Sequence, residues 1–205
     1  MTPQDIILGV RRITGDEEIP LKDTDAQLLA RINDCLSVMV DIRPDLFSAT
    51  GAHVCSAGPD QTLAFARARS ILEVVSITAG PAVLPADRGA MDRFNPGWRN
   101  STGAAASNWM PIPDSPLSFS LYPPALSGQS VDVRYVQPHA ILTTTSSTIN
   151  LLPNYGPAIE AYVVWIADAG DDPDKYSSTS VAFLGQFAAL LGVKPAAVRQ
   201  AAGAA

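Results

Sequence analysis

The chain has 205 residues, of which 47% are hydrophobic and 17% are charged. This length suits one large domain, or a core domain with a sizeable insertion, and the apolar content excludes a largely disordered chain. The net charge is −6, and the 14 Lys and Arg residues form no basic cluster. The composition therefore argues against sequence-independent nucleic-acid binding, because an acidic surface repels DNA.

The cysteines and the apolar runs indicate where the protein works. Cys35 and Cys55 fit no metal-ligand or C-x-x-C spacing, so we expect two buried thiols and no disulfide framework. The N-terminal apolar run is too short for a signal peptide, and no stretch approaches the ~20 apolar residues of a membrane span. We expect a protein of the reducing cytoplasm, or of an assembly made there, without a membrane.

Two helix-start signals mark the N-terminal segment. Thr2-Pro3 predicts a short helix that reaches about Arg12. Residues 24–27 have the form of a capping box, and apolar residues follow at helical spacing. Because Pro44 stops this pattern, the second predicted helix covers residues 25–41.

The middle of the chain carries strand patterns and one short helix. Residues 61–64 and 70–78 are candidate strands, and Pro85 opens a predicted helix over residues 85–94. Residues 117–122 and 130–136 both alternate apolar and polar side chains. Because a connection of moderate length joins them, the sequence predicts a β-hairpin from these two runs.

The C-terminal part returns to helical patterns. Residues 158–169 and 177–191 carry apolar side chains at helical spacing, with Ser177 as a possible N-cap and Gly192 after the last turn. The last stretch is small and weakly polar, so we expect a frayed helix or a tail that orders on a partner.

This order predicts an α+β fold, in which a small helical bundle from the N- and C-terminal segments carries an inserted β-rich module. Neither helical block can bury its apolar stripe alone, so the two blocks must pack together. The expected divisions are N-terminal bundle helices 1–50, a β-rich insertion 51–150 with an extended loop 95–113, C-terminal bundle helices 151–192, and a flexible tail 193–205.

Motifs for catalysis and for cofactors are absent from the sequence. There is no G-x-S-x-G, H-E-x-x-H, Walker A or G-x-G-x-x-G pattern, so we expect His53 and His139 to be structural or surface residues. The acidic run 170–174 lacks the EF-hand spacing, and residues 16–18 fit a solvated loop or a patch facing a partner. We predict no catalytic residue, no metal and no cofactor.

Arginine and tryptophan residues of the middle segment suggest contacts with other chains. Arg67 and Arg69 alternate with alanines, which fits one side of an edge strand or a polar contact to a neighbouring subunit. Trp98 and Trp109 flank a run of small residues, and Trp and Arg are enriched at interface hot spots. Composition leaves two interpretations open: the tryptophans pack on the β-rich module, or they anchor a contact with another chain.

Four segments in a shared order carry a family resemblance. The first contains LPADRGAMDRFNPGW, the second pairs Asn-Trp-Met with an aromatic strand ending in Tyr-Pro-Pro, the third is VDVRYVQP, and the fourth is the helical C-terminus ending in Leu-Gly. These segments are residues 84–98, 108–124, 131–138 and 155–192. Over residues 28–192 the chain resembles the head-to-tail adaptor, or connector, proteins of tailed bacteriophages. The Ser/Thr run 143–148 departs from the family, and the tail after Gly192 has no motif to transfer.

The resemblance implies a structural virion protein of the neck between capsid and tail, assembled in the host cytoplasm. Such adaptors form a ring, typically a dodecamer, that docks below the portal protein and continues its DNA channel. Double-stranded DNA passes through without specific binding, and the lower surface contacts tail or nozzle proteins. The resemblance implies no enzyme activity, in agreement with the missing motifs.

In such a ring, we expect the extended loop to order on a neighbouring subunit or on the tail, with small residues supplying reach. The expected contact residues are Arg93, Phe94, Trp98, Arg99, Trp109 and Met110. Arg67 and Arg69 are candidates for a contact between subunits, and Lys194, Val198 and Arg199 for docking to the portal. The alternatives are a tail-tube, stopper or tail-terminator protein, or, in another class, a soluble hydrolase or carbohydrate-binding module.

Overall fold

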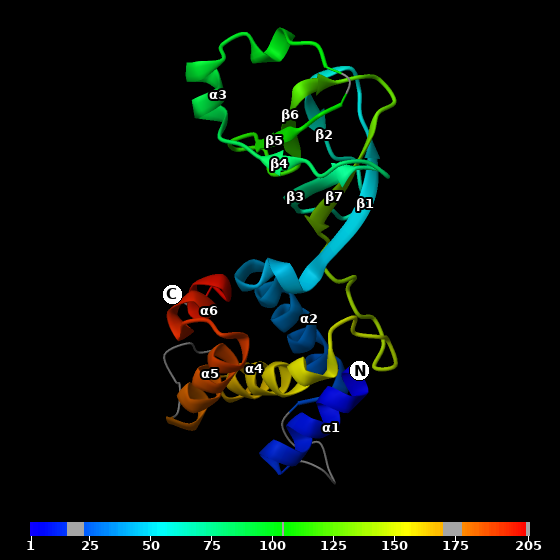
Figure 1. Ribbon diagram of the computed structural model, residues 1–205. Coiled ribbons are helices and arrows are strands. Elements are labelled where there is room, and N and C mark those ends of the chain that lie inside the picture. Colours follow the sequence, from blue (N-terminus) through cyan, green and yellow to red (C-terminus); the bar gives the residue numbers. More distant parts are fainter. Residues whose placement is uncertain (16–22, 104, 170–177, 204–205) are drawn as a thin grey trace. The chain divides into compact units, whose positions relative to one another are not determined.

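The computed structural model describes residues 1–15, 23–103, 105–169 and 178–203, and its fold is α+β, as predicted (Figure 1). The chain divides into two compact units. The helical unit consists of Met1–Leu46 and His139–Ala205, and the β-module consists of Phe47–Pro138. The module is therefore inserted between the two halves of the helical unit, with boundaries after residues 46 and 138 instead of the expected 50 and 150.

The first two helices begin where the sequence predicts. In α1 (Pro3–Thr14), the Thr2 side chain caps the first turn through a capping box, and Gly15 ends the helix with a left-handed φ of 70°. In α2 (Asp25–Ile42), Thr24 forms the expected capping box. These local hydrogen bonds satisfy main-chain N–H groups that a helix start leaves without partners, which fixes both starting points.

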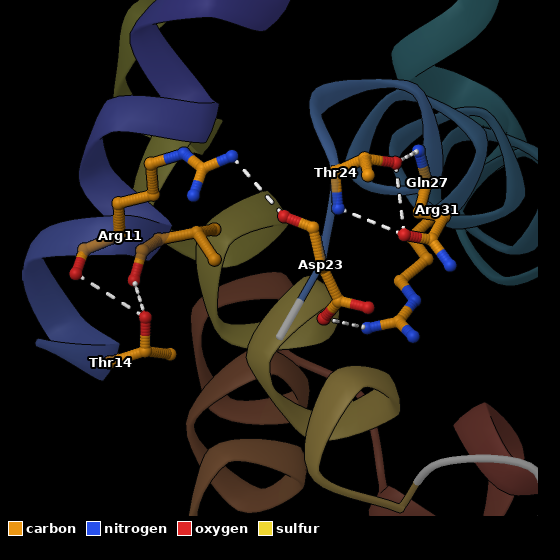
Figure 2. Close-up of polar contacts among 7 residues, drawn as sticks. Arg11, Thr14, Asp23, Thr24, Gln27 and Arg31 are labelled. Carbon is orange, nitrogen blue, oxygen red and sulfur yellow. Dashed lines mark hydrogen bonds and ion pairs between the residues drawn. The ribbon is translucent and has the colours of Figure 1, made fainter. Parts of the chain in front are cut away.

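Asp23 links the two N-terminal helices (Figure 2). Its carbonyl oxygen accepts a hydrogen bond from Arg11 Nη2 of α1 at 3.2 Å, and its carboxylate accepts one from Arg31 Nη1 of α2 at 2.8 Å. Arg11 also donates to Asp25 Oδ1 at 2.6 Å. The buried Arg11 side chain therefore holds the start of α2 against α1.

The helix α4 (Gly156–Ala169) is the centre of the helical unit, since it contacts α1, α2 and α5 (Ser178–Leu191). Its buried side chains lie on nearly every side of the helix: Ala158, Ile159, Ala161, Tyr162, Val163, Val164, Trp165 and Ala167. The rings of Trp165 and Phe187 lie 5.3 Å and 5.1 Å from that of Tyr162. The N- and C-terminal helices thus share one core.

The C-terminal segment is ordered over most of its length. Residues Pro195–Ala201 form α6, which packs on α2 and α5, and Val198 is fully buried. The expectation of a flexible tail after residue 192 is therefore wrong for this helix, because the Val198 side chain is buried where α6 packs on the other helices. Gly192 ends α5 with a φ of 68°, as its position predicted.

The β-module contains two sheets. One has the antiparallel order β1-β7-β3, and the other has the order β2-β6-β5-β4, in which only β4 and β5 are parallel. The strands are β1 (Ser48–Val54), β2 (Gly58–Thr62), β3 (Ser70–Ile77), β4 (Leu84–Pro85), β5 (Asn108–Pro111), β6 (Ser118–Ala125) and β7 (Ser130–Val136). The short helices are α3 (Arg88–Phe94) and the 3-10 turns η1 (Pro44–Phe47), η2 (Trp98–Asn100) and η3 (Pro153–Tyr155).

The predicted hairpin is wrong, because β6 and β7 belong to different sheets. Phe119 and Leu121 of β6 and Val131 and Val133 of β7 enter one buried core. Alternation of apolar and polar residues shows that a strand has a buried face, but it does not name the partner strand. Gly128, with a φ of 83°, makes the turn by which the chain crosses from one sheet to the other.

Candidate interaction surface

The chain leaves the strands of the β-module in one long excursion between β4 and β5, residues 86–107, here called the arm (Figure 1). It begins with α3, whose first turn is capped by Asp87 Oδ1 accepting from Ala90 N–H at 2.5 Å. None of the seven residues of α3 is buried. The helix therefore exposes all of its faces, at least in part, to solvent.

One carboxylate fastens α3 to the next turn of the arm. Asp92 Oδ1 accepts hydrogen bonds from Trp98 Nε1 at 2.8 Å and from Arg99 Nη1 at 2.6 Å. The Arg99 guanidinium also lies 4.4 Å from the centre of the Trp98 ring. The hydrogen bonds from Arg99 and Trp98 lower the pKa of Asp92, so the carboxylate stays charged at neutral pH.

Asp92 was not among the residues selected from the sequence. It is the single acidic residue between Asp87 and Asp114, in a stretch that contains three arginines. A lone acid among cations is a signal for an ion pair, and this signal could have identified Asp92 in advance.

Three of the four apolar or aromatic residues of the predicted contact set lie inside the β-module. Trp98 is 0% exposed, Trp109 8% and Met110 0%. The turn that holds Trp98 packs on β6, and Trp109 belongs to the core between the sheets. The expectation that these three side chains contact another chain is therefore corrected, because their surface is already covered. The first of the two interpretations, packing on the module, holds for both tryptophans.

The run of small residues is attached to the module. Ser107 N–H donates to the Tyr122 carbonyl at 2.8 Å, and Ala106 is buried in the core. A Cβ on Gly103 would lie 2.5 Å from Pro123 Cγ, so only glycine permits this approach. The small side chains therefore allow the chain to lie close to β6. The described residues on both sides of residue 104 thus contact the module within one chain.

The charged and exposed members of the contact set remain on the surface. Arg93 is exposed, and Phe94, at the end of α3, is 80% exposed. Arg99 is partly exposed beside them in sequence. Leu84, which precedes the arm, is 61% exposed. The outer surface of the arm thus presents an aromatic ring and cations.

The other arginine pair lies in the connection between β2 and β3. Arg67 and Arg69 are exposed, and Arg67 has a left-handed φ of 60°. Its Nη1 donates to the Pro138 carbonyl at 3.4 Å. The interpretation that the pair forms one side of an edge strand does not hold, because Arg67 lies in a turn, whereas Arg69 comes directly before β3 and its N–H donates to the Val136 carbonyl at 2.9 Å.

Of the three residues predicted to contact the portal, two are exposed and one is buried. Lys194 precedes the helix and is exposed, as is Arg199 within it. Val198 is fully buried in the helical unit, so its proposed role in docking is corrected. Lys194 and Arg199 are therefore the two cations available for a contact with another protein at this end of the chain.

The remaining described cysteines and acidic residues form no recognisable catalytic or metal site. Cys35 and Cys55 are free and buried, as predicted, and burial raises the pKa of Cys55 to about 11. Within the described ranges, no three His, Cys, Asp or Glu residues are grouped to hold a metal ion. The acidic runs 16–18 and 170–174 lie outside the described residues.

The described part of the helical unit contains a pocket of about 450 Å³ beside Leu46, Leu152 and Tyr155, and another of about 370 Å³ that is lined by residues of α1, α2, α4 and α5. Arg11 is in the wall of the second pocket, but its guanidinium is bonded to Asp23 and Asp25. Over the described part of the chain, no single helix has the length and hydropathy of a membrane span. In the same part of the chain, only α5 and α6 taken together have this length and hydropathy, and the two helices are bent by 100° relative to each other.

No protein-family model matches this chain, and no curated protein matches its sequence.

Proposed function

We propose that this chain is a structural assembly protein, an adaptor subunit of the neck of a tailed bacteriophage. In this proposal a ring of copies, about a dodecamer, docks below the portal, continues the DNA channel and carries the surface to which tail or nozzle proteins attach. The observation that supports it is the inserted architecture. A helical unit built from both ends of the chain carries a β-module of residues 47–138, which is the arrangement that the adaptor resemblance implies.

The surface of the arm suits a contact with another chain. The helix α3 buries none of its residues, and it carries Arg93 and Phe94 outward. Phenylalanine and arginine are both enriched at protein interfaces, and arginine is one of the residue types most frequent at hot spots. We therefore assign the subunit or tail contact to Arg93, Phe94 and Arg99, and the portal contact to Lys194 and Arg199.

The charge of the chain fits a channel that DNA must pass. The net charge is −6, and a surface of like charge to the phosphates does not retain DNA. The helical unit also favours an adaptor over tail-tube, stopper and terminator proteins, which we expect to be mainly β. No observation in the described residues favours a hydrolase or a carbohydrate-binding module.

The direct test is reconstitution with the portal protein of the phage that encodes the chain. Electron microscopy of the mixture should show a ring bound to one end of the portal, and mass measurement should give its copy number. A chain that neither binds the portal nor is found in the neck of the virion would rule the adaptor function out.

A pair of variants tests the arm. The double substitution Arg93→Glu and Phe94→Asp should abolish ring closure or tail attachment, because it removes the aromatic contact and reverses a charge. Leu126→Asp is the matched control, since Leu126 is 58% exposed in the connection between β6 and β7. Normal tailed particles with the arm variant would show that the arm has no part in assembly.

A further inference from the structure

The strand β1 lies at the edge of its sheet. It pairs with β7 over all seven residues, Ser48 to Val54, without a register shift. Within the described part of the chain, no strand pairs with its other side. An edge strand presents a row of main-chain donors and acceptors that another strand can pair with.

The hydrogen bonds at the two ends of β1 show which residues face outward. Gln137 N–H donates to the Phe47 carbonyl at 2.8 Å, and Cys55 N–H donates to the Gln129 carbonyl at 2.7 Å. Since bonded and non-bonded residues alternate in an antiparallel pair, the odd-numbered residues face β7. The even-numbered residues turn their N–H and C=O groups away from it: Ser48, Thr50, Ala52 and Val54. These four residues also have exposed side chains.

The other edges of the two sheets are protected in the ways that monomeric proteins use. The outer side of β3 is partly bonded, for example by Val83 N–H to the Val75 carbonyl at 3.0 Å, and its register with β7 shifts twice. A proline lies within β2, and β4 has only two residues and ends in a proline. By contrast, β1 has the sequence SATGAHV, with no proline and no Asp, Glu, Lys or Arg.

We propose that β1 pairs with β1 of a second copy of this chain, antiparallel, about a two-fold axis at Gly51. The pairing joins two three-stranded sheets into one sheet of six strands. Thr50 then lies opposite Ala52 of the second copy, and Ser48 lies opposite Val54. The four outward residues of each copy can exchange up to about eight hydrogen bonds in this arrangement.

The hydrogen-bond count favours a second copy in this register, because all four outward residues of one β1 then lie opposite the four outward residues of the other. A shift by two residues in either direction loses one hydrogen-bonded pair at the end of the strand.

This inference does not rest on the proposed adaptor function. A two-fold contact uses the same surface on both copies, whereas a closed ring of one layer uses two different surfaces on each subunit. The β1 pairing therefore describes the free chain before it enters a ring.

Sedimentation equilibrium of the purified chain tests the proposal. The wild-type chain should reach twice its mass of 21.6 kDa as concentration rises. The variant Thr50→Lys with Ala52→Lys places lysines opposite lysines, so its dissociation constant should rise at least about tenfold. The variant Thr50→Lys with Ala52→Glu places each lysine opposite a glutamate of the second copy, so it should still form dimers.

The two variants change the same exposed positions, and circular dichroism should show the same folded content for both. A wild-type chain that stays monomeric, or forms only ring-sized species, would overturn the proposal. So would a lysine–glutamate variant as weak as the double-lysine variant, because the register would then be wrong. Neither result bears on portal binding, which is measured separately on the mixture with the portal.

Discussion

The helices α4 and α3 are opposites in how they are stabilised. Eight described side chains of α4 are buried, including Tyr162 and Trp165, so tertiary packing holds this helix in place. None of the seven residues of α3 is fully buried, and a helix of that length is unstable alone in water. It depends on its cap and on the hydrogen bonds that Asp92 accepts. Most of the surface of α4 is therefore buried within the chain, whereas the surface of α3 is accessible to a partner.

The largest expected effect is at the centre of α4. Trp165→Ala should lower the free energy of unfolding by about 3–5 kcal/mol, because it leaves a cavity at a fully buried position. Urea denaturation measures the change. The control Leu190→Ala, at a position on α5 that is 45% exposed, should change it by no more than about 0.5 kcal/mol. A loss of unfolding free energy at Trp165 as small as that of the control would show that tertiary packing does not hold α4 in place, and α4 would then not differ from α3 in this respect.

A smaller loss is expected at the polar contact between α1 and α2. Arg11→Ala removes the donors to the Asp23 carbonyl and to Asp25, so the free energy of unfolding should fall by about 1–3 kcal/mol. The same denaturation assay with Arg199→Ala, an exposed arginine of α6, provides the control. Equal losses in both variants would mean that burial of Arg11 has no bearing on its contribution.

The β-module should respond to acid through His53. Burial lowers the pKa of His53 below 6.5, so the unfolded chain takes up the proton more readily than the folded chain. The contribution of neutral His53 to stability is therefore complete above pH 6.5 and declines as the pH falls through the lowered pKa. Thermal denaturation between pH 7.5 and 5 should show this decline, and His53→Gln should reduce it. An unchanged slope in the variant would assign the decline to other groups.

Asp92→Asn should loosen the arm without unfolding the module. The amide is uncharged, so it is a weaker acceptor for Trp98 Nε1 and Arg99 Nη1. Limited proteolysis should then cut the arm faster than in the wild-type chain. The control is Glu73→Gln on β3, an exposed carboxylate outside the arm. If both variants are cut at the wild-type rate, Asp92 does not hold the arm.

The smallest effect on stability is expected at Phe94. Phe94→Ala should change the free energy of unfolding by no more than about 0.5 kcal/mol, because the ring is 80% exposed. A loss comparable to that of Trp165→Ala would show that α3 packs within the chain after all. We expect this variant to fold normally and to assemble poorly. That result would separate a role of Phe94 in the contact with another chain from a role in the stability of the fold.

Local signals were enough to predict the helical unit. The caps at Thr2 and Thr24 and the glycines at 15 and 192 fixed the ends of helices, because each acts on main-chain groups a few residues away. The exception is α6, whose order comes from burial of Val198 against helices distant in sequence. The weakly polar sequence of this segment has no pattern from which the contact could be predicted.

Four strands and the short helix of the β-module were predicted, but β1, β4, β5 and the pairing of the strands were not. The alternation in β6 and β7 correctly indicated strands, but both strands bury side chains in one core from different sheets. The edge strand β1 was missed, since Gly and Ala make SATGAHV a poor strand sequence and only its pairing with β7 defines it. The burial of Trp98 depends on Asp92 and β6, which composition cannot show.

The chain enters and leaves the β-module at the same place. Ser48 is paired with Val136, and Gln137 donates to the Phe47 carbonyl at 2.8 Å, so the two crossing points are neighbouring strands. A short linker could therefore replace residues 47–138, and a different domain with adjacent ends could be grafted there. In evolutionary terms, this geometry permits exchange of the module by recombination while the helical sequence on either side is kept.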